Sequence, residues 1–383
     1  MSTKIEEALI NIIRSVVIDG APDSAASAVR ELSEDELKEL LSLAKLHQVS
    51  HIVAYVMMNV GDERFSKPFF ATAGLTAKQQ FAVGEITRNF ADANIPFIML
   101  KGVVLRKLYP ESWMRNSCDI DVFVKEEFLG EAEEILSKLG YEKKAGVDGL
   151  SAHDVQFEKK KVHVELHYAL VAENLYPKVD QVLADVWALS ISDGTSEHYM
   201  TDEAFYFYHV VHMVKHFENG GCGIRPVLDL WLLNHRTEFD QNRRDELLER
   251  GGLLKFEREI SRLSELWFGD GDGEGLDDLA QFLFSGGAYG TTANSVALKK
   301  TKCGGGFCYF MKRIFAPYSL LRRYYPILNK HPFLLPIYEV KRWFDALSRD
   351  KAKYMRELRE NVKSGGDEKM TAMLKSLGLK DEG

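Results

Sequence analysis

A short run near the middle of the chain constrains the fold most, because Cys118–Val124 reads CDIDVFV and sets two aspartates among apolar residues. Side chains of a β-strand alternate between the two faces of a sheet, so Asp119 and Asp121 share one face and the intervening apolar residues share the other. Two like charges this close repel each other unless a cation lies between them. The run therefore predicts a strand that is buried on one face and binds a cation on the other.

The later run VHVELH, residues 162–167, follows the same alternation and places His163, Glu165 and His167 on one face. If both strands belong to one sheet, Glu165 completes a three-carboxylate cluster with the two aspartates. Oxygen ligands in this number suit Mg²⁺, with Mn²⁺ as a substitute. Two such ions can activate an attacking oxygen and neutralise a leaving pyrophosphate. Glu165 is also a candidate general base.

Upstream of the aspartates, the apolar run 95–100 predicts a buried strand, which Lys101 and Gly102 end before a short helix. A glycine in such a turn lets backbone amides approach a phosphate, and the helix N-terminus adds partial positive charge. Lys101 would then be a point charge for triphosphate oxygens. Arg115, in the loop before the acidic strand, could clamp a phosphate or pair with a local acid such as Glu111.

The rest of the chain reads mainly as helix, with apolar residues at helical spacing before and after the central block. The sequence thus predicts an α+β, mostly helical protein: an N-terminal helical region at 1–72, a mixed α/β domain at 73–198 and a C-terminal helical domain at 199–383. Segment 310–338 mixes cations, aromatics and prolines. We expect it to pack as an extension with snorkelling cations rather than to bind membrane or nucleic acid.

Composition narrows the class of protein. The net charge of −8 argues against a general nucleic-acid binder, which needs cations to neutralise phosphates. The four cysteines form no CxxC pair, which indicates reduced thiols and a cytoplasmic protein. No window approaches eighteen apolar residues, so we expect no transmembrane segment.

The order of these elements resembles the DNA polymerase β-like nucleotidyltransferase superfamily, and the form LKG…LYP…R…DIDVFV…VELH is similar to its uncharacterised bacterial branch. The likeness extends through HVVHMVKHF…GIRPVLDLWLL and covers about residues 40–345. It implies that Asp119 and Asp121 are the metal-binding pair, that Glu165 is the third carboxylate, and that Lys101-Gly102 is the nucleotide turn. This chain departs from the superfamily's usual Gly-Gly or Gly-Ser turn and from its commoner third aspartate.

The resemblance implies transfer of a nucleoside monophosphate from a triphosphate, ATP among the candidates, to an acceptor with release of pyrophosphate. The acceptor is a small molecule, a sugar or a protein, with nucleic acid less favoured by the acidic charge. An alternative is a catalytically inactive binding or regulatory module that keeps the fold. A second alternative is a phosphohydrolase that uses water as the acceptor.

Beyond the central block, His209, His212 and His216 recur at spacing that places them on one helix face. Zinc would need a further ligand, which no obvious residue supplies, so packing or cleft-lining roles are favoured. Four residues of this region are predicted to line the acceptor or base side of the cleft: Lys215, His216, Arg225 and Asp229.

Overall fold

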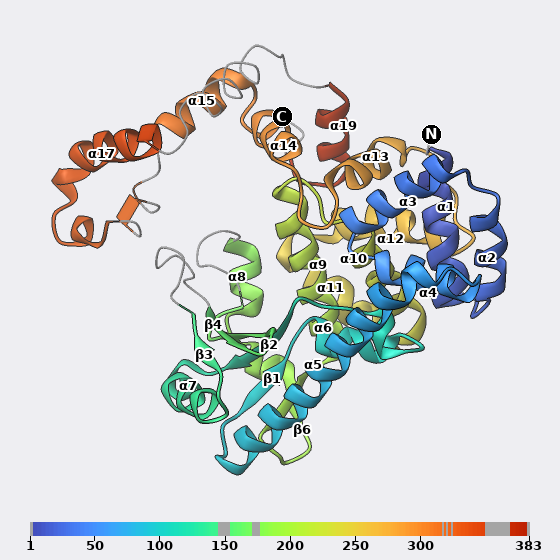
Figure 1. Cartoon of the computed structure of the whole chain (residues 1–383). Coiled ribbons are helices and arrows are strands. Elements are labelled where there is room, and N and C mark those ends of the chain that lie inside the picture. The colour runs from blue at the N-terminus through green and yellow to red at the C-terminus, as the bar shows by residue number, and fades with distance from the viewer. Residues whose placement is uncertain are drawn as a thin grey trace.

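The computed structural model describes residues 3–144, 154–170, 177–315, 318, 321–322, 325–348 and 368–380. Residues 349–367 of the expected C-terminal domain lie outside this set. Figure 1 shows a helical body, a sheet beside it and an arm that projects from the body. The expected fold class, α+β and mostly helical with one mixed sheet, is confirmed for the described residues.

The strands of the described residues form a seven-stranded mixed sheet in the order β3-β4-β5-β2-β1-β7-β6. Their bounds are β1 Phe97–Met99, β2 Asp119–Val124, β3 Glu142–Lys143, β4 Asp154–Lys159, β5 Val162–His167, β6 Ser190–Ser192 and β7 Glu197–Met200. The strands predicted over 95–100, 118–124 and 162–167 are confirmed as β1, β2 and β5. The acidic strand β2 is central, since it pairs with β1 in antiparallel and with β5 in parallel orientation.

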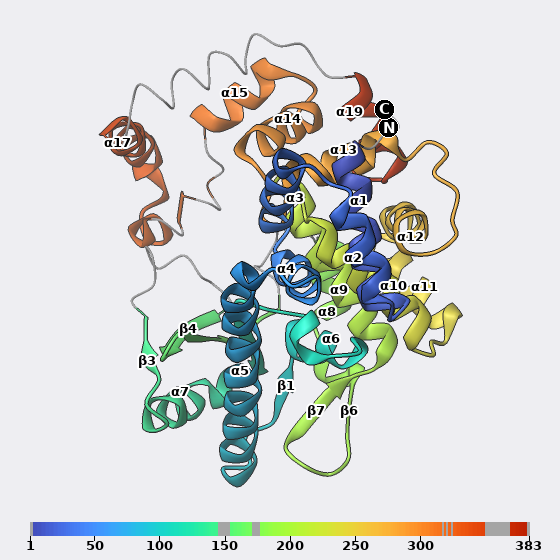
Figure 2. The same cartoon turned by 45° about the vertical axis from the view of Figure 1, so that its right-hand side comes forward.

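One face of the sheet is covered by α5 (Ser66–Asp92) and α7 (Leu129–Lys138), as Figure 2 shows. Ile120, Val122 and Val124 of β2 are buried in the core beneath these helices. The predicted alternation of β2 is therefore confirmed, and its aspartates lie on the opposite face, toward the helical body. Helix α5 also continues through the expected domain boundary at residue 72.

The helical body combines both ends of the chain. Its N-terminal helices are α1 Lys4–Ile13, α2 Pro22–Arg30, α3 Glu34–Leu46 and α4 Ser50–Asn59, with a π-helical turn η1 at Arg14–Ile18. Its later helices are α8 Pro177–Leu183, α9 Asp202–Glu218, α10 Ile224–Arg236, α11 Gln241–Gly251, α12 Leu254–Phe268, α13 Asp277–Gly286, α14 Thr292–Lys302 and α19 Glu368–Ser376. Helices α1 and α12 pack together, and residues from both ends form one hydrophobic core.

Short elements connect the larger ones. They are α6 Gly102–Leu105 and the 3₁₀ turns η2 Glu63–Phe65, η3 Arg106–Leu108, η4 Ser112–Met114, η5 Glu126–Phe128, η6 Val186–Leu189, η7 Pro326–Asn329 and η8 Pro332–Leu334. The helical pattern over residues 35–60 forms two helices, α3 and α4, because Gln48 adopts a left-handed conformation with φ of 58° between them.

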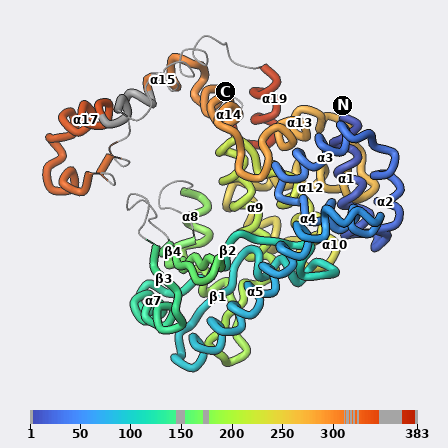
Figure 3. Tube along the Cα trace, viewed as in Figure 1, coloured from blue at the N-terminus to red at the C-terminus, as the bar shows by residue number. Residues whose placement is uncertain are grey.

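Helices α15 (Gly306–Ile314) and α17 (Leu335–Ser348) form the projecting arm, which Figure 3 traces away from the body. Within the segment 310–338, Leu321 and Leu328 are fully buried, whereas Phe333 and Ile337 are 75% and 62% exposed. The expected packing of this segment therefore stays a prediction. Within the described residues, no helix has the length and apolar character needed to cross a bilayer.

Candidate nucleotide-binding site

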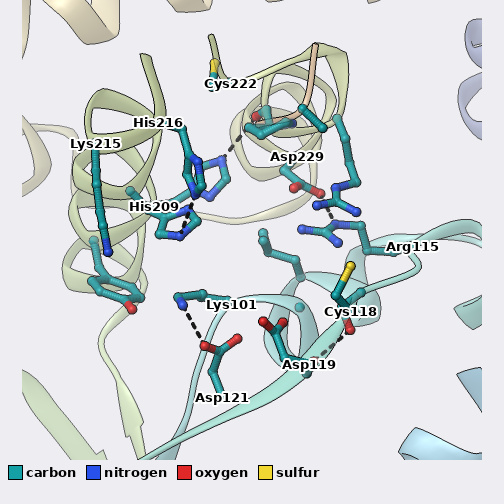
Figure 4. A pocket seen from close by; sticks show the side chains of 18 of the residues that line it. Lys101, Arg115, Cys118, Asp119, Asp121, His209, Lys215, His216, Cys222 and Asp229 are labelled. Atoms are coloured by element: carbon teal, nitrogen blue, oxygen red, sulfur yellow. Dashed lines mark hydrogen bonds and ion pairs between the residues drawn. The ribbon is translucent and has the colours of Figure 1, made fainter. Parts of the chain in front are cut away.

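A cavity of ≈ 250 Å³ lies between the acidic face of the sheet and helices α9 and α10 (Figure 4). All ten residues that the sequence assigned to metal, nucleotide or acceptor binding line it: Lys101, Gly102, Arg115, Asp119, Asp121, Glu165, Lys215, His216, Arg225 and Asp229. In Figure 4 the carboxylates of Asp119 and Asp121 rise from the strand toward the helices, from which Lys215 and His216 extend into the same space. The cavity therefore has an acidic wall on the sheet and a nitrogen-rich wall on the helices.

The register of β2 and β5 assembles the acidic wall. Asp121 lies directly opposite Glu165, and Asp119 lies opposite His163, in the parallel pairing of the two strands. The sequence placed Glu165 near the aspartates only on the condition that the strands share a sheet, and the structure meets that condition. Asp121 is 1% exposed, so its charge depends on partners rather than on water.

Two basic side chains contact the buried Asp121. The Lys101 Nζ lies 2.6 Å from Asp121 Oδ1 and 3.9 Å from Glu165 Oε2. The His167 Nε2 lies 2.9 Å from Asp121 Oδ1 and 3.4 Å from Glu165 Oε2. Burial alone would raise the pKa of Asp121, but the Lys101 charge and the contacts of His167 hold that pKa well below its usual range.

Asp119 has the opposite electrostatic character. Burial, together with the neighbouring charges of Asp121 and Glu165, raises the pKa of Asp119 to about 7. The cluster thus carries more negative charge than its surroundings balance. A set of carboxylates with this surplus, joined by an imidazole, has donor chemistry that fits a hard divalent cation such as Mg²⁺ or Mn²⁺.

Within the described residues, potential metal-ligand atoms of Asp121, Glu165 and His167 all lie within 4.8 Å of one another. This group differs from the expected one, since it contains His167 in place of Asp119. Sequence reasoning had set His167 on the correct face by alternation but had not counted it as a ligand. The sequence therefore contained a signal for this ligand, because His167 follows Glu165 by two residues and lies on the same face of the strand.

The turn at Lys101, between β1 and α6, has an unusual backbone conformation. Lys101 has φ of 44° and ψ of −117°, a left-handed conformation that favours glycine. The next residue, Gly102, is buried, and a Cβ placed on it would lie 2.9 Å from the Ser117 Cβ. Helix α6 has only four residues, so the partial charge expected at its N-terminus is small. Close backbone approach and the Lys101 ammonium are what this turn offers.

Arg115 is paired inside the protein rather than at its surface. Its Nε donates to Asp229 Oδ1 at 2.7 Å, and Tyr109 Oη donates to the same oxygen at 2.8 Å. Asp229 is fully buried, and despite that burial the Arg115 charge lowers the pKa of Asp229. The local pairing of Arg115 with Glu111 that the sequence left open is replaced by this long-range contact.

The three histidines of α9 line the cavity but do not converge as a zinc site. His209 Nε2 contacts the Pro226 carbonyl oxygen at 3.1 Å, whereas the Nε2 atoms of His212 and His216 lie 3.2 Å apart. Burial, followed by the charge of Lys215, lowers the pKa of His216 to about 4. These imidazoles are therefore neutral near pH 7 and leave the permanent positive charge of this wall to lysine and arginine.

Arg225 supplies one of those charges. Its Nη1 donates to the carbonyl and side-chain oxygens of Asn116 at 3.2 and 3.3 Å, next to the acidic strand. Sequence reasoning missed Tyr208 and Tyr289, which also line the cavity. No chemical motif marks either of them, because one lies in a continuous apolar helix and the other in a glycine-rich loop.

A central strand with two inward carboxylates, a parallel neighbour with a third, and a glycine turn at the end of the adjoining strand are the features of a nucleotidyltransferase site. The family model described as uncharacterised nucleotidyltransferase matches residues 33–269, more than half of the chain. The chain therefore belongs to this family and is a transferase of nucleotide groups. The match ends at Gly269, directly after α12, and so before residue 345, where the resemblance was expected to end. Searches among curated proteins and among solved structures gave no significant match.

Proposed function

We propose that the protein transfers a nucleoside monophosphate from a nucleoside triphosphate to an acceptor hydroxyl or phosphate in the presence of Mg²⁺, with Mn²⁺ as a substitute. The acceptor oxygen attacks the α-phosphorus, the bond to the bridging oxygen breaks, and its electron pair leaves with pyrophosphate. The observation that carries this proposal is the pairing of Asp121 with Glu165, which gathers three carboxylates on one face of the sheet.

Asp119, Asp121 and Glu165 would hold the metal, and His167 is placed to join them through its contacts with Asp121 and Glu165. A bound divalent cation would neutralise charge on phosphate oxygens. Glu165 is partly exposed to the cavity, so it is the carboxylate positioned to accept the acceptor's proton. The chain's main contribution is otherwise to hold the reactants in line and to exclude water.

The turn at Lys101 and Gly102 supports the triphosphate part of the proposal. Gly102 lines the cavity, and the absence of a side chain lets the turn pack against Ser117. The backbone of this turn is therefore what a phosphate oxygen would meet. Lys215 and Arg225 on the opposite wall offer positive charge to the remaining phosphates or to the acceptor. We assign no base specificity, because the cavity residues named here recognise charge rather than a base edge.

Calorimetric titration of non-hydrolysable analogues of the four common triphosphates, with and without Mg²⁺, tests the binding step. We expect Mg²⁺-dependent binding that Asp121→Asn removes while circular dichroism stays unchanged. Absence of binding for every analogue, or equal binding by Asp121→Asn, would contradict the proposal. Release of pyrophosphate together with a labelled nucleotidyl product separates a transferase from a phosphohydrolase, which yields a free nucleotide.

A further inference from the structure

We propose that the Lys101 ammonium is a built-in cation of the carboxylate cluster, so that the site takes one divalent ion per chain in place of the two expected from the sequence. This inference rests on the proposed function, because it concerns the same cluster. It assigns Lys101 to the carboxylates, whereas the sequence assigned it to the triphosphate.

The contacts place the ammonium between two carboxylates from different strands. Lys101 Nζ is 2.6 Å from Asp121 Oδ1 and 3.9 Å from Glu165 Oε2, and Figure 4 shows it directed at the acidic strand. The Lys101 side chain is only 20% exposed and that of Asp121 only 2%. A buried, charge-assisted contact of this length is far more persistent than a surface ion pair.

The backbone of Lys101 indicates that the side chain is needed at this position. L-residues other than asparagine and aspartate rarely adopt φ of 44°, and glycine would adopt it without strain. The turn is fixed by its neighbours, because Leu100 N donates to Asp121 O and Leu105 N donates to Lys101 O. Backbone strain that is kept at a candidate site points to function, and the strained turn here places the Lys101 ammonium beside Asp121.

Occupancy of the carboxylate oxygens leads to the same stoichiometry. Lys101 contacts Asp121 and lies near Glu165, so its ammonium takes up part of the space between the two strands that a metal ion would need. A second ion would have to compete with the ammonium for Asp121, whose Oδ1 already contacts both Lys101 and His167.

Binding of Mn²⁺, counted from the electron paramagnetic resonance signal of the free ion, tests the proposal without any activity assay. Lys101→Met removes the charge and keeps a side chain of similar length. Lys101→Gly removes the charge and also relieves the backbone, which keeps the test valid if Lys101→Met folds poorly. Lys107→Met is the matched control, since Lys107 is exposed and contacts the Tyr199 ring instead of the carboxylates.

We expect the wild type and Lys107→Met to bind one Mn²⁺ per chain in the absence of nucleotide. Both Lys101 variants should bind the first ion roughly ten- to a hundredfold more tightly, since a positive charge a few ångströms away is gone, and should gain a second ion. Two ions in the wild type, or unchanged affinity in both variants, would overturn the role of Lys101 and leave the proposed function intact. Failure of every protein to bind Mn²⁺ would overturn both.

Discussion

The buried pair of Arg115 and Asp229 gives the sharpest test of the structure, because it separates a structural arginine from a phosphate ligand. Asp229→Asn keeps the shape of the side chain and an oxygen that can accept from Tyr109, but it removes the charge opposite Arg115. The Arg115 and Asp229 side chains are 7% and 0% exposed. Water therefore cannot replace the lost partner, and the guanidinium is left buried and unbalanced.

We expect Asp229→Asn to lower the free energy of unfolding by about 3–5 kcal/mol, the usual cost of removing one member of a buried ion pair. Arg115→Met should cost a similar amount. The double variant should lose less than the sum of the two, with a coupling energy of roughly 1–3 kcal/mol. Urea unfolding followed by circular dichroism gives these values from the midpoints and slopes.

Glu134→Gln is the matched control, since Glu134 pairs with Lys138 on an exposed helix surface, where both side chains are at least 65% exposed. It should cost under about 0.5 kcal/mol. Additive effects of the two buried substitutions, or a loss under about 1 kcal/mol for Asp229→Asn, would refute the structural role of the pair. A nucleotide affinity that falls in Arg115→Met and not in Asp229→Asn would instead make Arg115 a phosphate ligand.

Three further outcomes can be measured on the same protein. Asp119→Asn should keep or slightly raise the stability of the metal-free protein, because burial and its acidic neighbours already raise the pKa of Asp119 to about 7. Asp121→Asn should lower this stability, because it removes the anion of two ion pairs. A Mg²⁺-induced rise in melting temperature that survives both substitutions would exclude the site. Gly102→Val should lower the free energy of unfolding in urea by roughly 1–3 kcal/mol and weaken nucleotide binding, because the new Cβ would lie 2.9 Å from a serine side chain. An unchanged dissociation constant for the nucleotide would show that the turn is not part of the site. Burial lowers the pKa of His47 and of His51 from 6.5 to about 4. Between these two pH values the unfolded chain binds more protons than the folded one, so the free energy of unfolding should fall as the pH drops, by up to about 3 kcal/mol for each histidine. A melting temperature independent of pH between 6.5 and 4 would contradict this.

The acidic wall was predictable because it depends on local rules. Alternation along each strand set Asp119, Asp121 and Glu165 on their faces, and the pairing of β2 with β5 then brought Asp121 and Glu165 opposite each other. The metal-binding role of these residues stays a prediction. Their positions do not, since strand periodicity is a property of the backbone that distant contacts rarely change.

The partner of Arg115 was not predictable from the sequence. Arg115 and Asp229 are 114 positions apart, and although the sequence predicted that Asp229 lines the cleft, it contained no signal that links Asp229 to Arg115. Glu111 was the natural candidate because ion pairs can be inferred only between neighbours. The choice of partner is made by burial, since α10 packs against η3 and brings Asp229 to an arginine that has no water to solvate it.

The conformation of Lys101 was hidden for a similar reason. A lysine at a strand end reads as a solvated cap, and its positive φ is imposed by the hydrogen bonds that hold the turn against β2. The departure from the superfamily's Gly-Gly turn was visible in the sequence, but its consequence was not. Where the superfamily has a glycine, this chain has Lys101, and its side chain brings a positive charge to Asp121.

The division of charge across the cavity explains why the helical region has to be part of the site. In the proposed function, Lys101 and the bound divalent cation offset negative charge of the three carboxylates, and the negative charge of the triphosphate then needs a second source of positive charge. Among the described residues, Arg115 of the loop before β2 does not supply it, because it is already paired with Asp229. The neutral histidines of α9 cannot supply it near pH 7. The requirement therefore falls on Lys215 and Arg225, which reach the cavity only when α9 and α10 stand over the sheet. An isolated sheet domain would keep the carboxylates and lack the charge that attracts the nucleotide.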